Sequence, residues 1–203
     1  MPPPSLVLFD MDDVLCSYSI ERRAAYLARL AGSTTEAVVA AIWGSGFETL
    51  ADNGTIDAEA YLRGCGERIG HRLTLQEWID ARRAATAPQT EVLELVQRVR
   101  QKAKVAVLTN NPTLVEDHIQ LLFPELPPLF GSSIYASAGF KTAKPAAECY
   151  QRCLSVLCIA PADALFIDDL TENVAGAQAA GLAAHNFTSA HALAEFLRGR
   201  GLL

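Results

Sequence analysis

Three short, wholly apolar runs, each followed at once by polar side chains, constrain the fold of this chain more than any other feature. They cover residues 6–9, 105–108 and 164–167, and they are followed by Asp10, Thr109 and Asp168. Apolar runs of about four residues without polar alternation are typical of strands buried on both faces of a parallel sheet. We therefore expect three central strands that end at a common polar edge.

Helical patterns alternate with strands in the second half of the chain. Weaker strands are expected at 134–136 and 183–187, and helices at 91–100, 113–122, 146–157 and 173–180. This alternation predicts an α/β fold, with a parallel sheet flanked by helices. Residues 17–87 lack this alternation, because no buried strand separates their helical patterns. These patterns cover residues 20–31, 35–42, 58–69 and 75–85. The simplest interpretation is an all-helical insertion after the first strand.

Composition narrows the class of protein. The chain has 203 residues, of which 50% are hydrophobic, which is enough for one core with a modest insertion. A net charge of −6 and the lack of any Lys/Arg cluster argue against nucleic-acid binding. The five cysteines are odd in number and irregularly spaced, so no disulfide framework is expected. No apolar run is long enough for a signal sequence or a membrane span, and we expect a soluble, cytoplasmic protein without membrane partners.

The polar residues that follow the apolar runs are the candidates for chemistry. In an open α/β sheet, ligands bind beyond the carboxyl ends of the strands. We therefore expect these side chains to converge there: Asp10, Asp12, Asp13, Thr109, Asn110, Asp168 and Asp169. Four or more carboxylates facing each other do not all stay ionised without a cation, and a hard ion with oxygen ligands, Mg²⁺ above all, fits them. The D-x-D spacing of Asp10 and Asp12 suits one ionised carboxylate and one that carries a proton.

Four motifs in order resemble a known family. F-D-M-D-D-V-L, L-T-N-N, K-P and F-I-D-D are similar to the four signature motifs of the haloacid dehalogenase (HAD) superfamily, over most of residues 5–182. The resemblance implies a Rossmann-like catalytic core at residues 1–16 and 88–203, and a helical cap domain of the capped subfamily I at residues 17–87. The D-D-x-x-x-N form that starts at Asp168 is similar to sugar-phosphatase-like members and to the phosphatase domain of soluble epoxide hydrolases.

The resemblance also implies roles for the residues of the first two motifs. Asp10 would be the nucleophile, forming an aspartyl-phosphate, and would bind the metal through its other oxygen. Asp12 would be the general acid and then the general base, and its backbone carbonyl would bind Mg²⁺. Thr109, with Asn110 beside it, would hydrogen-bond the phosphoryl oxygens. This division of work suits phosphoryl transfer, in which positioning and charge neutralisation dominate catalysis.

The remaining motifs would supply charge. Lys144 would neutralise the nucleophile and the phosphate, Asp169 would bind the metal directly, and Asp168 would act behind it or through water. Two departures from the family pattern stand out. Asp13 occupies a position that is often Gly, and the segment before Lys144 is longer than usual, which leaves Lys141 as a less favoured substitute.

Together these observations predict a Mg²⁺-dependent phosphomonoesterase that acts on a small phosphorylated metabolite, such as a sugar phosphate. Two alternatives stay within the superfamily. A 2-haloacid dehalogenase needs the nucleophile but neither a metal nor an acid two residues later, so Asp12 and the paired acids at 168 and 169 argue against it. A phosphomutase would return the phosphoryl group to substrate. The third alternative is a non-catalytic binding protein, which is expected to lack a motif residue, whereas all four motifs are filled here.

Overall fold

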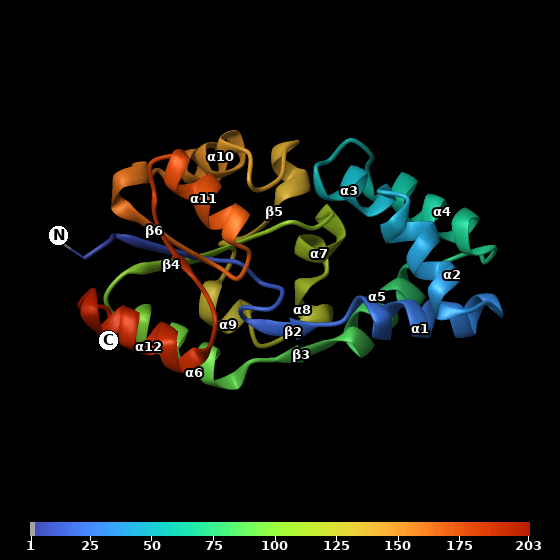
Figure 1. Cartoon of the computed structure of the whole chain (residues 1–203), viewed down its shortest axis with the longest axis horizontal. Coiled ribbons are helices and arrows are strands. Elements are labelled where there is room, and N and C mark those ends of the chain that lie inside the picture. Colours follow the sequence, from blue (N-terminus) through green and yellow to red (C-terminus); the bar gives the residue numbers. More distant parts are fainter. Residues whose placement is uncertain (1–2) are drawn as a thin grey trace.

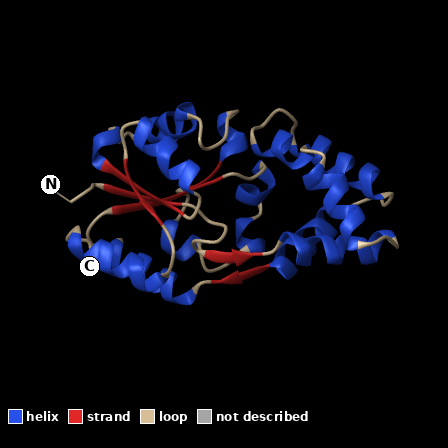
Figure 2. Ribbon diagram, in the orientation of Figure 1, coloured by secondary structure: helices blue, strands red, loops and turns tan. Residues whose placement is uncertain are grey.

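The computed structural model describes residues 3–203, so the first two residues of the expected core lie outside the described part. Within it, a sheet of five parallel strands forms the centre of the molecule, in the order β5-β4-β1-β6-β7 (Figures 1 and 2). The strands are β1 (Leu6–Phe9), β4 (Lys104–Thr109), β5 (Ile134–Ala136), β6 (Ala164–Asp168) and β7 (Ala183–Asn186). The three strands predicted from apolar runs lie side by side in the middle, which confirms the expected α/β fold.

The register of the sheet brings its polar ends together. Phe9 of β1 pairs with Val107 of β4 and with Ile167 of β6, so the three strands end within a residue or two of each other. The backbone N–H of Asp10 still donates to the carbonyl of Ile167, at 2.8 Å. Asp10 is therefore held rigidly where β1 leaves the sheet.

Alternating side chains of the strands point to two hydrophobic layers. Val7 and Phe9 face a layer built by α6 (Thr90–Val99), α9 (Pro127–Phe130) and α12 (Ala190–Gly199). Leu6 and Leu8 face a second layer built by α10 (Ala147–Leu157) and α11 (Thr171–Ala179). Figure 1 shows α10 and α11 on one side of the sheet, and α6 and α12 on the other. Two short helices, α7 (Thr113–Asp117) and α8 (Ile119–Leu122), follow β4.

Five α-helices are inserted between β2 (Cys16–Tyr18) and β3 (Thr86–Pro88), which pair in antiparallel fashion. These residues, 20–85, are called the helical segment here. Its helices are α1 (Ile20–Ala31), α2 (Thr35–Val39), α3 (Phe47–Asp52), α4 (Ala58–Ile69) and α5 (Leu75–Ala85), with a π-helical turn at Ala40–Gly44. The helical segment lies at the end of the molecule away from both termini (Figure 1). Its position after the first strand agrees with the predicted insertion, while its status as a separate domain stays a prediction.

The structure departs from the expected elements in a few places. The helix expected at 35–42 changes to π-helical hydrogen bonding at Ala40, and the one expected at 113–122 is broken at His118, whose φ is −118°. Helices α3, α9 and α12, and the short strands β2 and β3, were not expected. Among the helices of residues 3–203, none combines the length and the apolar character needed to cross a bilayer.

Candidate active site

The carboxyl ends of the strands surround a cavity of about 190 Å³. Most of the predicted site residues line it together with two neighbours from the start of α11: Asp10, Asp12, Asp13, Thr109, Asn110, Lys144, Asp169, Leu170 and Asn173. The structure thus brings the four motifs to one place. Asp168 is fully buried behind this lining.

A buried triad of charges forms the floor of the cavity. The Nζ atom of Lys144 lies 2.7 Å from Asp10 Oδ1 and 2.7 Å from Asp168 Oδ2. The contact with Asp10 is an ion pair, and no donor among residues 3–203 meets strict hydrogen-bond geometry at Asp10 Oδ1. Burial alone would lower the pKa of Lys144, but the charges of Asp10 and Asp168 outweigh it and raise that pKa. Lys144 therefore stays protonated and supplies a fixed positive charge.

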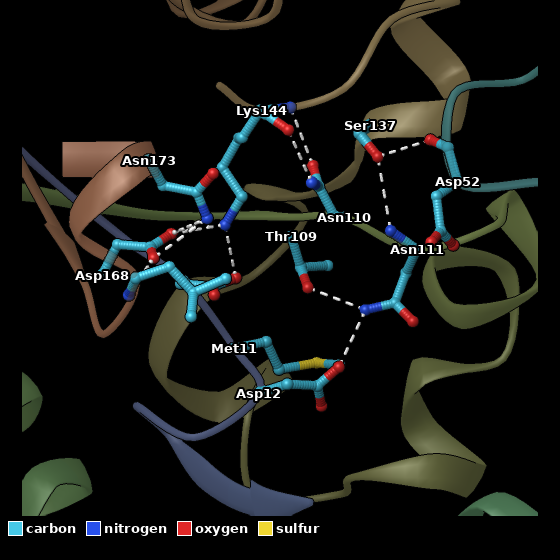
Figure 3. Close-up of polar contacts among 12 residues, drawn as sticks. Met11, Asp12, Asp52, Thr109, Asn110, Asn111, Ser137, Lys144, Asp168 and Asn173 are labelled. Carbon is cyan, nitrogen blue, oxygen red and sulfur yellow. Dashed lines mark hydrogen bonds and ion pairs between the residues drawn. The ribbon is translucent and has the colours of Figure 1, made fainter. Parts of the chain in front are cut away.

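The backbone of Lys144 is held from both sides. The side-chain amide of Asn110 donates to the carbonyl of Lys144 and accepts from its N–H, each at 2.9 Å (Figure 3). On the other side, α11 presents Gly176 to Pro145. A Cβ atom at Gly176 would lie 2.3 Å from the carbonyl oxygen of Pro145, so only glycine allows this close approach. Asn110 thus lines the cavity while its amide group positions Lys144.

Asp168 is saturated with donors. Its Oδ2 accepts from Lys144, its Oδ1 accepts from the backbone N–H of Leu170 at 2.9 Å, and Asn173 Nδ2 reaches both oxygens at 3.0 and 3.1 Å. Figure 3 shows this convergence of Lys144 and Asn173 on Asp168. With both oxygens occupied, Asp168 is suited to orienting Lys144 rather than to binding a ligand directly.

The remaining carboxylates carry unbalanced negative charge. One oxygen each of Asp10, Asp168 and Asp169 lie within 4.8 Å of one another. Burial, with a further contribution from Asp168, raises the pKa of Asp10 to about 8 despite the opposing effect of Lys144. The pKa of Asp169 is also raised, first by burial and then by the charge of Asp168. Three carboxylates beside one ammonium group leave a net negative site. The oxygens of Asp10 and Asp169, rather than those of the fully hydrogen-bonded Asp168, are donors that fit a hard divalent cation such as Mg²⁺.

Asp12 faces a different set of partners. Nη2 of Arg82 donates to Asp12 Oδ1 at 2.8 Å and to Oδ2 at 2.6 Å, and Asn111 Nδ2 donates to Oδ2 at 3.1 Å. The same Asn111 amide donates to Thr109 Oγ1 at 2.7 Å, which links the ends of β1 and β4 (Figure 3). The side chains of Asp10 and Asp12 therefore lie in one cavity but in separate polar environments.

Arg82 and Asn111 were not among the residues expected at the site. Asn111 follows Thr109 by two residues, and alternation along an extended chain places such residues on the same side. Arg82 lies three residues after Ile79 and four after Trp78, so it occupies the apolar face of its helix. An arginine at a position that should be buried is a signal for a charged partner.

The two departures noted in the sequence have structural counterparts. Asp13 adopts a left-handed conformation with φ of 59°, which explains why glycine suits this position, and its Oδ1 accepts from the N–H of Tyr18 at 3.0 Å. Lys141 Nζ donates to the carbonyl of Gly54 in the helical segment, at 3.1 Å. It is thus Lys144, and not Lys141, that contacts Asp10.

Solved structures of similar fold come from several bacteria. A HAD family enzyme from Bacteroides thetaiotaomicron, in complex with magnesium and inorganic phosphate, is 22% identical, with a TM-score of 0.75 over 91% of this chain and 94% of that one. A predicted HAD-like hydrolase from Porphyromonas gingivalis is 21% identical, with a TM-score of 0.79 over 96% and 98%. The L-2-haloacid dehalogenase from Xanthobacter autotrophicus, with chloropropionic acid covalently bound, is 18% identical, with a TM-score of 0.66 over 98% and 84%. At these identities the likeness concerns the fold.

The family itself follows from the sequence match. Residues 4–181, which include every motif at the cavity, match the haloacid dehalogenase-like hydrolases. The parallel sheet, the insertion after its first strand and the acidic edge agree with that match. This chain therefore belongs to the haloacid dehalogenase-like hydrolase family.

Proposed function

We propose that this hydrolase is a magnesium-dependent phosphomonoesterase that acts on a small phosphorylated metabolite, such as a sugar phosphate, through an aspartyl-phosphate intermediate. One observation carries the proposal. Two carboxylates, Asp10 and Asp12, line the same small cavity together with Lys144 and Asp169. There Lys144 can neutralise the negative charge of a phosphoryl group, and Asp169 can bind the accompanying cation. A hydrolysis that needs a nucleophile and a separate proton carrier requires such a pair.

In the first step a carboxylate oxygen of Asp10 attacks phosphorus while the bond from phosphorus to the leaving oxygen breaks. Asp12 gives its proton to that oxygen, and the alcohol leaves. Lys144 neutralises part of the charge on the phosphoryl oxygens, and the Thr109 hydroxyl group lies where it can donate to one of them. In phosphoryl transfer, such positioning and charge neutralisation provide most of the rate enhancement.

In the second step water attacks the same phosphorus atom. Asp12, now ionised, accepts a proton from this water, and the bond between Asp10 and phosphorus breaks. Inorganic phosphate leaves, and Asp10 is regenerated as a carboxylate. Hydrogen bonds from Arg82 and Asn111 hold the Asp12 carboxyl group in the lining of the same cavity as Asp10, which supports its role in both steps.

Asp10, Asp169 and the backbone carbonyl of Asp12 would hold Mg²⁺, with Asp168 supporting them from behind. The bound ion would neutralise negative charge on the carboxylates and on the phosphoryl oxygens. The magnesium and phosphate complex of the Bacteroides enzyme supports this assignment by analogy. The raised pKa of Asp10 supports it independently, because a second positive charge would keep this buried carboxylate ionised.

We further propose that the helical segment acts as a cap over the sheet edge. Ser137 Oγ donates to the carbonyl of Asp52 at 2.6 Å, Lys141 binds Gly54, and Arg82 binds Asp12, so the segment contacts the core on both sides of the cavity. A cap of this kind excludes bulk water and macromolecular substrates from the reacting groups.

A second candidate is a 2-haloacid dehalogenase, favoured by the likeness to the Xanthobacter enzyme with chloropropionic acid covalently bound. Both reactions use an aspartate nucleophile, but halide displacement needs neither Asp12 nor a metal. Halide release from 2-chloropropionate in excess chelator would favour the dehalogenase. A phosphomutase would be distinguished by formation of an isomeric sugar phosphate from a hexose 1-phosphate, in place of inorganic phosphate.

The direct test is phosphate release from 4-nitrophenyl phosphate and from a panel of phosphorylated metabolites. Asp10→Asn is expected to abolish turnover, and a chelator to do so reversibly. The matched control is Asp163→Asn, an exposed carboxyl group at the opposite end of β6. Full activity of Asp10→Asn, with the Asp163→Asn variant equally active, would show that the proposed chemistry is wrong.

A further inference from the structure

The contact between Arg82 and Asp12 joins the helical segment to the candidate acid. Arg82 lies in the last turn of α5, and its partner is 70 residues away in the sequence, at the carboxyl end of β1. The guanidinium group reaches both carboxylate oxygens with a single nitrogen, Nη2, at 2.8 and 2.6 Å. Hydrogen bonds between two charged groups at such distances are among the strongest in proteins.

Arg82 enters this contact from a fixed position. The residue is 3% exposed, and the guanidinium carbon lies 3.9 Å from the centre of the Tyr18 ring. The hydroxyl group of Thr86 donates to the carbonyl of Arg82 at 2.9 Å, which anchors the end of α5. Because Tyr18 and Thr86 pair with each other in β2 and β3, the side chain of Arg82 is held where the helical segment joins the core.

The other donors to Asp12 are weaker. Asn111 contributes a neutral amide at 3.1 Å, and Cys16 contributes a thiol at 3.6 Å. The Asp12 side chain is 21% exposed, so it has room to rotate. Removal of Arg82 would leave the carboxylate with these neutral donors alone among the described residues, and its orientation toward the cavity would no longer be fixed.

We propose that Arg82 is a positioning residue for Asp12, supplied by the helical segment, and that it directs the Asp12 carboxyl group toward the leaving oxygen of the substrate. This inference rests on the proposed role of Asp12. The ionised carboxylate accepts from Arg82 on both oxygens. When Asp12 is protonated, one oxygen still accepts from Arg82 while the other carries the proton to the leaving group. Arg82 itself is not among the residues that line the cavity, so it acts through Asp12.

The role of a positioned acid depends on the leaving group. An alkoxide leaves only with a proton, whereas 4-nitrophenolate is stable enough to leave without one. Loss of Arg82 should therefore slow formation of the aspartyl-phosphate from an alkyl phosphate much more than its formation from 4-nitrophenyl phosphate. A residue that merely stabilises the fold would affect both substrates to the same extent.

The experiment compares kcat/KM for glycerol 2-phosphate and 4-nitrophenyl phosphate in saturating Mg²⁺. This ratio reports the steps up to formation of the aspartyl-phosphate, so it excludes the second step, in which Asp12 acts as base whatever the substrate was. For Arg82→Gln, we expect kcat/KM to fall about 100-fold on the alkyl phosphate and less than about threefold on the aryl phosphate. Arg82→Lys, which keeps a charged donor, should recover part of the loss. The matched control is Arg83→Gln, since Arg83 is the exposed neighbour in the same helix, and it should leave both rates unchanged.

Equal losses on the two substrates, or no loss on either, would overturn the proposal. If circular dichroism shows that Arg82→Gln does not fold, the two substrates are compared with Arg82→Met instead, because its apolar side chain suits a buried site. The Asp10→Asn variant separates this inference from the proposed function. If Asp10→Asn retains activity on 4-nitrophenyl phosphate, the phosphatase mechanism is wrong, whereas a failure confined to the Arg82 variants concerns Arg82 alone.

Discussion

Replacing Gly176 by alanine tests how closely the position of Lys144 depends on packing. The added Cβ would lie 2.3 Å from the carbonyl oxygen of Pro145 and 2.7 Å from its Cβ, whereas ordinary van der Waals contact begins at 3.4 Å. The obstacle is backbone rather than the end of a flexible side chain. Helix α11 and the segment before α10 must therefore separate by about 1 Å.

The expected magnitude follows from two opposing effects. Overpacking of this kind costs about 1–3 kcal/mol, while alanine is favoured over glycine within a helix by about 1 kcal/mol. We expect a net loss of up to about 2 kcal/mol, which for a chain of this length lowers Tm by up to about 8 °C. Because Lys144 directly precedes Pro145, the same shift should move Nζ away from Asp10 and lower kcat by about 10–100-fold.

The assay is thermal unfolding by circular dichroism together with turnover of 4-nitrophenyl phosphate. Gly199→Ala is the matched control, because Gly199 also lies in an α-helix and a Cβ there would meet no atom within 4 Å. It should keep full activity and the Tm of the wild type, or gain slightly. A Gly176→Ala variant that melts at or above the wild-type temperature, with unchanged kcat, would refute the reasoning.

Three further outcomes are expected. Asp13→Ala should lower the free energy of unfolding in urea by about 1–2 kcal/mol because of the positive φ, whereas Asp13→Gly should cost less than Asp13→Ala. Arg23→Met should cost about 3–5 kcal/mol in the same assay, because the mostly buried Glu48 would lose its positive partner and keep only the Tyr61 hydroxyl group. Arg63→Met, at an exposed ion pair, should change stability by less than about 1 kcal/mol. Mg²⁺ at 100 times its dissociation constant should stabilise the protein by about 2.7 kcal/mol, and the rise in Tm over a chelator control should vanish in Asp169→Asn.

Much of the fold could be predicted because its signals are local. The apolar runs of β1, β4 and β6 are buried on both faces, so their composition alone identifies them. Helices α1, α4 and α5 were predicted with their observed bounds, since each has a polar N-cap and an apolar face. Helix α3 has only six residues, and α9 has four and begins with two prolines, so propensity was too weak to reveal either. Helix α12 lies outside the predicted helices even though Ser189 caps it.

The candidate site, like the fold, could be predicted only in part from the sequence. The convergence of Asp10, Thr109 and Asp168 follows from the rule that parallel strands end at one edge, and the structure places them there. The contacts that organise them join distant parts of the chain. Asn110 was expected to face the phosphate, but its amide binds the backbone of a residue 34 positions later. Arg82 finds its carboxylate only once the helical segment has packed. No periodicity encodes such a pairing.

The antiparallel pairing of β2 with β3 has a consequence for how such an enzyme can change. Cys16 lies opposite Pro88, so the chain enters and leaves the helical segment at the same point. The helical segment between these strands could be replaced as one cassette, in evolution or by protein engineering, without moving β1 or β4. Under the proposed function, a grafted cassette would place a new cap over an unaltered set of site residues at the sheet edge, on one condition. It would have to carry a cation of its own at the place where Arg82 now meets Asp12.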